Sequence, residues 1–233
     1  MQQLDFIILG GGASGLQLAY RLSNHTAFAN ASILILESNN HKGNDRTWCY
    51  WETGDGEWDD LLQNQWNKVQ FKSKNVNKTI DLGSASYKML RSKPYYERLH
   101  QSLANNKSIQ IEYARCIGFV DEGSHVTVST DMQTYRCSTL FNSIFDWKVL
   151  NKQSRYPVLQ QHFLGWYIKT PRPLFDTETA VFMDFTVAQH QETRFMYVLP
   201  YTQTEALIEY TLFSKELLDK SDYEDAIRDY LQN

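Results

Sequence analysis

Three glycines and a glutamate near the N-terminus have the types and spacing that hold a nucleotide. Gly10, Gly12 and Gly15 follow the pattern GxGxxG, and Glu37 lies 22 residues beyond the last of them. The chemistry needs glycines because a side chain at this turn would keep the backbone away from a pyrophosphate. The amides at Ser14 and Gly15 then meet the negative charge, and the Glu37 carboxylate accepts hydrogen bonds from ribose hydroxyls.

Two apolar strands and a helix are predicted around this turn. Residues 4–9 and 32–36 are short apolar runs, and residues 16–22 have helical spacing. The alternative is a glycine turn in an α/β protein that binds no nucleotide, but the order of strand, turn, helix, strand and acid is the context that the motif requires. We add Ala13, inside the turn, to the candidate cofactor contacts. These residues alone do not decide whether the dinucleotide is FAD or NAD, although a fingerprint this early in the chain favours FAD.

The composition is that of a globular chain long enough for one large domain or two small ones. Hydrophobic residues make up 42% of 233, and the net charge of −4 argues against a nucleic-acid partner. Three scattered cysteines and the absence of paired histidine spacing predict reduced thiols, no metal site and a cytoplasmic chain. Asp5 interrupts any signal peptide, and no apolar run is long enough to span a bilayer.

The middle of the chain predicts a loop, a helix and two groups of strands. Residues 38–67 are polar and irregular, and residues 87–105 predict a helix with Pro94 in its first turn. The short strands are expected at 69–72, 79–82, 109–113, 116–120, 125–129 and 135–145. The strands after residue 109 form a meander, which in flavoproteins packs beside the nucleotide sheet.

The last third of the chain predicts an antiparallel sheet that carries two acids. Its strands are expected at 160–169, 180–185, 195–200 and 205–213, followed by a helix at 221–231. Alternation places Glu209 on a mostly apolar face, where burial raises the pKa of a carboxyl and prepares it as a general acid. The alternative is a half-buried strand end from which Glu209 reaches solvent. Asp184 shares a face with Phe182 and Thr186 by the same count and is a second candidate.

Four segments together resemble the lycopene cyclase family of flavoproteins. They are the glycine turn, Asp45-Arg46-Thr47-Trp48-Cys49, Phe163-Leu164-Gly165-Trp166 with Val181 to Phe185, and Phe195 to Pro200 running into Ile208 to Thr211. The resemblance implies an enzyme that closes the ψ-ends of lycopene into β-ionone rings, giving γ- and then β-carotene. It also implies reduced FAD, with NAD(P)H as reductant and no net redox change.

The resemblance assigns roles to individual residues. The first glutamate of the family's acidic motif falls on Glu209, the acid–base candidate, and the second acid of some members is Tyr210 here. Arg46 and Arg91 join the candidate cofactor contacts. Four aromatic side chains are candidates for stabilising a carbocation through their π faces, and each has a place in an ordinary core as the alternative: Trp48, Trp51, Trp166 and Tyr197.

The expected architecture is a Rossmann-like three-layer α/β domain for FAD or NAD(P), with an antiparallel substrate domain. The first comprises 1–50 and 86–147, and the second 51–85 and 148–233. We expect an acyclic carotenoid substrate and peripheral membrane contact. The family's late glycine-rich segment would lie beyond Asn233, so we expect the N-terminal part of a cyclase. A flavin-dependent hydroxylase or reductase and an inactive FAD-binding fragment are the alternatives.

Overall fold

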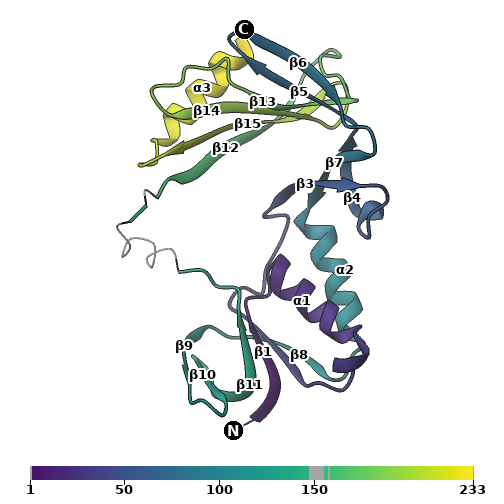
Figure 1. Cartoon of the computed structure of the whole chain (residues 1–233), viewed down its shortest axis with the longest axis vertical. Helices are drawn as coiled ribbons and strands as arrows, with labels where there is room; N and C mark the ends of the chain where they lie inside the picture. The colour runs from purple at the N-terminus through teal and green to yellow at the C-terminus, as the bar shows by residue number, and fades with distance from the viewer. Residues whose placement is uncertain (1, 147–154, 157, 233) are drawn as a thin grey trace. The chain divides into compact units, whose positions relative to one another are not determined.

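The chain forms two compact units, each assembled from two stretches of sequence. The computed structural model describes residues 2–146, 155–156 and 158–232 (Figure 1). The first unit comprises Met1–Trp48 with Arg91–Trp147, and the second comprises Cys49–Leu90 with Lys148–Asn233. Residues 147 and 148, where we expect a domain boundary, lie outside the described residues.

The first unit is built on a six-stranded sheet with the order β8-β2-β1-β11-β10-β9. The strands are β1 (Gln2–Leu9), β2 (Ile33–Glu37), β8 (Ile109–Tyr113), β9 (Cys116–Asp121), β10 (Val126–Thr130) and β11 (Thr134–Asn142). β8, β2, β1 and β11 run parallel, whereas β10 and β9 continue the sheet antiparallel. The predicted meander therefore joins the nucleotide sheet through β11.

Two helices accompany this sheet and lie side by side (Figure 1). α1 (Ala13–Ser23) connects β1 to β2 and is followed by a short 3₁₀ helix, η1 (Thr26–Phe28), while α2 (Ser92–Ala104) precedes β8. The Tyr95 hydroxyl of α2 donates to Gln17 Oε1 of α1 at 2.8 Å. The order β1, glycine turn, α1, β2 in a parallel sheet confirms the predicted Rossmann-like α/β fold.

The second unit is built on a larger and a smaller sheet. The larger has the order β12-β15-β14-β13-β5-β6 and the smaller the order β3-β7-β4. Their strands are β3 (Thr47–Thr53), β4 (Leu62–Trp66, after the 3₁₀ helix η2, Asp59–Leu61), β5 (Lys68–Ser73), β6 (Val76–Asp81), β7 (Ala85–Arg91), β12 (Gln160–Lys169), β13 (Thr179–Asp184), β14 (Thr193–Pro200) and β15 (Glu205–Ser214). The predicted antiparallel sheet is confirmed, although β13 pairs parallel with β5.

Both faces of the larger sheet are partly covered. α3 (Lys220–Gln232) packs its buried Tyr223 and Ile227 on one face, against even-numbered residues of β15 such as Tyr210. The smaller sheet packs on the other face, where Trp66 and Tyr87 form a cluster with Leu207 and Leu199. The alternation of β15 thus divides its side chains between two different environments.

The elements between residues 38 and 105 differ from the sequence prediction. Residues 38–67 are not one loop, because β3 and β4 lie within them and flank β7. The helix predicted at 87–105 begins only at Ser92, since the first five of its residues belong to β7. Pro94 does lie in the first turn, and Tyr95, Leu99 and Leu103 form the buried face that the spacing predicts.

Candidate functional site

The glycine turn of the first unit has the geometry of a phosphate cradle. Gly10 has a φ of +93°, a conformation that favours glycine, and its amide donates to Leu36 O at 2.8 Å. A Cβ at Gly15 would lie 1.9 Å from Gly10 O, so this position in the first turn of α1 requires glycine. At Gly12 a Cβ would meet only Lys42 Nζ, at 3.9 Å. The turn is therefore tight against its own sheet at Gly15 and open at Gly12.

The first turn of α1 lies beside this opening. Gly12 is the N-cap residue, and no side chain caps the helix there. The amides at the start of α1, which include those of Ala13, Ser14 and Gly15, are consequently available to an anion.

Glu37 ends β2 as a buried carboxylate that is held by several donors. It accepts hydrogen bonds from Gly11 N at 2.7 Å, Asn39 N at 2.8 Å and Lys42 Nζ at 2.5 Å. Burial alone would raise the pKa of Glu37, but the bonds from Lys42, Asn39 and Gly11 outweigh it and lower the pKa. The group is therefore anionic at neutral pH, as an acceptor for ribose hydroxyls must be.

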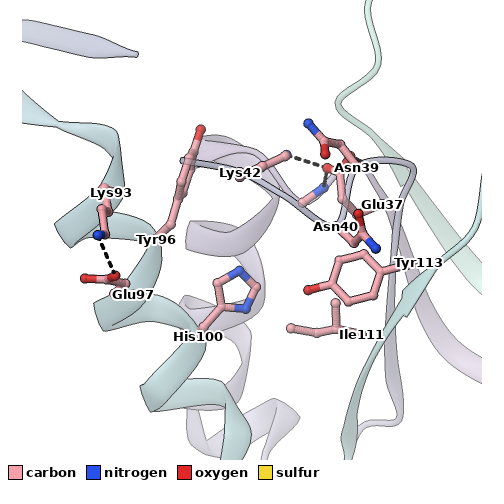
Figure 2. A pocket seen from close by; sticks show the side chains of 11 residues that line it. Glu37, Asn39, Asn40, Lys42, Lys93, Tyr96, Glu97, His100, Ile111 and Tyr113 are labelled. Atoms are coloured by element: carbon pink, nitrogen blue, oxygen red, sulfur yellow. Dashed lines mark hydrogen bonds and ion pairs between the residues drawn. The ribbon is translucent and has the colours of Figure 1, made fainter. Parts of the chain in front are cut away.

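A pocket of about 210 Å³ opens beside Glu37. Figure 2 shows Tyr96 and His100 of α2 on one side of it and Ile111 and Tyr113 of β8 on the other. The pocket also includes Gly11, Asn39, Asn40, Lys42, Lys93 and Glu97. Sequence reasoning missed these residues apart from Glu37, because only the fold brings α2 and β8 to the end of β2.

Arg46 and Arg91 lie together near the start of α2 and are not among the pocket's lining residues. Arg46 is exposed, and its backbone carbonyl accepts a hydrogen bond from Ser92 N. Its side-chain Nη1 donates to Asp45 O at 2.9 Å. Arg91 has the side chain of Asn44 at 2.7 Å from its Nε and Nη2. The structure thus brings Gly10 to Gly15 and Glu37 together, whereas neither arginine lines the pocket beside Glu37.

Glu209 lies in the middle of β15, the second strand of the larger sheet of the second unit, on the face opposite α3. Its direct neighbours are Gly165 on β12 and Tyr197 on β14. The side chain is half-buried, and the Thr211 hydroxyl donates to its Oε1 at 2.9 Å. Burial raises the pKa of Glu209, and the Thr211 bond offsets only part of that effect.

Three further groups with raised pKa values surround Glu209. Burial raises the pKa of Cys49 on β3 and of Tyr197 to about 12 each, and it raises the pKa of Tyr87 on β7 as well. The nearby Glu209 charge adds to each of these shifts. All three groups are neutral at physiological pH, and because thiols and phenols ionise only to anions, none of them supplies a cation that would keep Glu209 ionised. Sequence reasoning missed Tyr87 because it assigned that residue to a helix.

Aromatic rings continue outward from this cluster. The Trp51 ring lies 4.6 Å from that of Tyr87 and 5.1 Å from that of Phe182, between centroids. Phe182 in turn contacts Tyr197, with 5.8 Å between the centroids. Of the four aromatic candidates, Trp51 and Tyr197 therefore belong to the surroundings of Glu209.

The other two aromatic candidates have structural contacts elsewhere. Trp48 belongs to the first unit, where its ring packs edge-on against Tyr95 and Tyr96 of α2. Trp166 faces α3, and the Arg228 guanidinium lies 5.3 Å from the centre of its ring. Both have the core role that was the alternative for such residues.

Asp184 does not join Glu209, because a bulge in β13 changes its face. Val181 pairs with Val198 and Asp184 with Met196, so an advance of three residues along β13 matches an advance of two along β14. The extra residue is a β-bulge, and it places Val181 and Asp184 on the same face. The prediction that Asp184 shares a face with Phe182 is therefore wrong. Its carboxylate accepts from the Tyr230 hydroxyl of α3 at 2.9 Å and borders a wide cavity of about 1440 Å³ on the α3 side.

The Asp184 carboxylate is held in its ionised form. Burial works against the charge, but hydrogen bonds from Thr186 and Tyr230, together with Lys72 Nζ at 3.6 Å, lower its pKa. Its pKa thus moves in the direction opposite to that of Glu209.

The fold and the glycine turn define the class of protein. The parallel sheet, the GxGxxG turn before α1 and the acid that ends β2 are those of a dinucleotide-binding flavoprotein-type fold. A tryptophan halogenase from Shewanella frigidimarina has a TM-score of 0.68 at 8% identity, over 100% of this chain and 60% of that one. The halogenase PltM in complex with phloroglucinol and FAD has a TM-score of 0.63 at 11% identity, over 98% and 55%.

Sequence similarity then identifies the family. The model of the lycopene cyclase protein family matches residues 5–233, so the chain belongs to that family. A lycopene beta-cyclase from Pseudescherichia vulneris is 26% identical over 231 residues, which cover 90% of this chain and 52% of the relative. The chain thus spans about half the length of this curated relative. Within the described residues, the helices are too short or too polar to cross a membrane.

Proposed function

We propose that this chain carries out the acid–base step of lycopene cyclisation, closing the ψ-ends of lycopene into β-ionone rings. The observation that carries the proposal is the environment of Glu209, a half-buried carboxyl with a raised pKa among neutral and aromatic side chains. A carboxyl of this kind retains its proton to higher pH than an exposed one. Protonation of an unactivated alkene requires such an acid in an apolar site.

The proposed reaction is an isomerisation in which Glu209 donates and then recovers one proton. Its carboxyl proton is transferred to the terminal double bond of the ψ-end and leaves a tertiary carbocation. The electron pair of the neighbouring double bond forms the ring carbon–carbon bond. A proton from the carbon next to the new cationic centre then returns to the Glu209 carboxylate. Mass and oxidation state are unchanged, and the Tyr197, Tyr87 and Trp51 rings would stabilise the cation through their π faces.

We propose that the first unit holds FAD and the second unit the carotenoid. Gly10, Gly12, Ala13, Ser14 and Gly15 would bind the pyrophosphate, and Glu37 would bind the ribose. Bound in its reduced form, with NAD(P)H as the reductant, the flavin would supply an electron-rich ring without net redox change. Arg46 and Arg91 are proposed as further cofactor contacts, as cations of the same unit.

Asp184 has a different proposed role. Its ionised carboxylate links β13 to α3 through Tyr230 and to β5 through Lys72, so we assign it to structure and not to proton transfer. Because an acyclic carotenoid dissolves in bilayers, peripheral membrane contact also remains part of the proposal.

Expression of the chain in a lycopene-accumulating bacterium tests this function. We expect extracted pigment to change its retention on chromatography while its mass stays that of lycopene, and the purified chain to show a flavin absorption spectrum. A product whose mass differs by oxygen or hydrogen would favour a flavin-dependent hydroxylase or reductase. Unchanged lycopene beside a chain that retains flavin would contradict the proposal and favour an inactive FAD-binding fragment.

A further inference from the structure

Gly165 lies in an exposed position directly across the β12–β15 ladder from Glu209. Residues opposite one another in a ladder point to the same face, so the missing side chain leaves a gap beside the Glu209 carboxyl. Glycine weakens a strand interior, and the φ of Gly165 lies outside the left-handed region, so the backbone does not require it. The glycine therefore needs another explanation.

The space above Gly165 is next to both the acid and its apolar neighbour. A Cβ at this position would lie 3.6 Å from Glu209 Cβ and Cγ and 3.0 Å from Leu207 Cδ1. Any side chain longer than a methyl group would extend along the stem of Glu209. The position thus controls how closely another molecule approaches the carboxyl from β12.

The other sides of Glu209 are already covered. Tyr197 stands beside it on β14, and Cys49 and Tyr87 of the smaller sheet lie near enough for its charge to raise their pKa values. The β12 side is different, because Phe163 and Tyr167, two residues before and after Gly165, are 60% and 53% exposed. The exposed rings of Phe163 and Tyr167 therefore flank the empty position above Gly165, next to the Glu209 carboxyl.

We propose that Gly165 is the specificity-determining opening through which the apolar end of the substrate reaches Glu209, with Phe163 and Tyr167 as its two sides. The proposal rests on the proposed role of Glu209 as the acid. The group admitted is the methyl-branched end of an acyclic isoprenoid chain, whose terminal alkene must come into contact with a carboxyl oxygen. A β-branched residue at position 165 would occupy the place of that alkene.

An apolar carbodiimide, dicyclohexylcarbodiimide, tests this opening without any enzymatic activity. It adds to protonated carboxyls in apolar surroundings, and peptide mass spectrometry locates the adduct. We expect Glu209 to be labelled in the wild-type chain and about tenfold or more slowly in Gly165→Val, a size of effect typical of steric exclusion. Gln161→Val, on the same face of β12 four residues away, should label at the wild-type rate.

Two further measurements separate a closed opening from a damaged fold. Valine favours strands, so Gly165→Val should not lower the melting temperature, and Gly165→Ala, which the flexible Leu207 side chain can accommodate, should slow labelling less. Equal labelling of Glu209 in the wild type and Gly165→Val would overturn the proposal. If labelling depends on Gly165 but the wild type forms no cyclic carotenoid, the opening stands and the proposed function fails. If both chains cyclise lycopene equally, the opening is wrong and the function stands.

Discussion

Glu37, Asp184 and Glu209 are each at least partly withdrawn from water, and their hydrogen-bond partners decide which of them retains a proton. Glu37 has two backbone amides and Lys42, and Asp184 has Thr186, Tyr230 and Lys72, so both have lowered pKa values. Glu209 has only the Thr211 hydroxyl as a donor among the described residues, and its pKa is raised. The three acids differ in proton affinity because of their contacts and not because of their residue type.

The raised pKa of Glu209 predicts how stability depends on pH. The folded state binds this proton more tightly than the unfolded state, whose pKa is near 4.5. The contribution of Glu209 to the free energy of unfolding is therefore largest below that value and falls as the pH rises toward the folded-state pKa. Glu209→Gln lacks this dependence. In urea unfolding from about pH 5 to about pH 8, the stability of the variant relative to wild type should increase with pH. A difference that stays constant or shrinks would contradict the assignment.

The glycine turn gives a prediction in which two neighbouring glycines behave differently. Gly15→Ala places a Cβ 1.9 Å from Gly10 O and should lower the free energy of unfolding of the first unit by about 1–3 kcal/mol or more. Gly12→Ala, whose Cβ meets only Lys42 Nζ at 3.9 Å, should fold normally. It should nevertheless weaken FAD binding, measured by flavin fluorescence, because the methyl group occupies phosphate space. Equal stability of the two variants would contradict the tight packing at Gly15.

At the scale of elements, β7 shows why local sequence patterns predicted a helix where contacts with distant residues stabilise a strand. Its Lys88 side chain is fully buried, and its Nζ donates to Glu52 Oε2 at 2.9 Å, Asp59 Oδ1 at 2.7 Å and Gly54 O at 3.1 Å. These partners lie at the end of β3, in the turn after it and at the start of η2, some thirty residues earlier. Residues 87–91 share a helical spacing with residues 92–103, but the ammonium group obtains its three acceptors only if residues 87–91 form a strand.

Lys88→Met tests the importance of this network. The substitution removes three hydrogen bonds that the buried ammonium donates, while Glu52 and Asp59 keep contact with water at 35% and 31% side-chain exposure. We expect the free energy of unfolding to fall by about 1–3 kcal/mol, as measured by denaturant unfolding. Lys78→Met on the exposed strand β6 is the matched control and should change it by less than about 0.5 kcal/mol. A Lys88→Met chain as stable as the control would refute the structural role of the network.

Strands with regular alternation could be predicted from the sequence, and those with irregularities could not. β8 and β12 have the predicted bounds, and the alternation of β15 correctly separates Glu209 from Tyr210. In β13, by contrast, one bulge places Asp184 on the face of α3, and nothing in its local sequence indicates the bulge. The glycine turn was predictable because its chemistry is local. The pocket beside Glu37 was not, because α2 and β8 reach it from positions 93 to 113.

At the scale of the whole molecule, the proposed chemistry is divided between two units. The first contains the glycine turn and Glu37, and the second contains Glu209 with its aromatic surroundings. Cys49–Leu90 is inserted into the sequence of the first unit and contributes Cys49 and Tyr87 to the environment of the acid. Sequence position alone would not group these residues with β15, which lies more than a hundred residues later.

The most direct test of the account is the carotenoid content of lycopene-accumulating cells that express Glu209→Gln. The amide keeps the size of the side chain but has no acidic proton to donate. Glu205→Gln is the matched control, since it lies on the same strand and face and forms a surface pair with Lys169 at 2.9 Å. We predict that the wild type and Glu205→Gln convert lycopene to cyclic carotenoid. Glu209→Gln should leave lycopene unchanged while the purified variant retains flavin. Cyclic carotenoid in the Glu209→Gln cells would contradict the central claim.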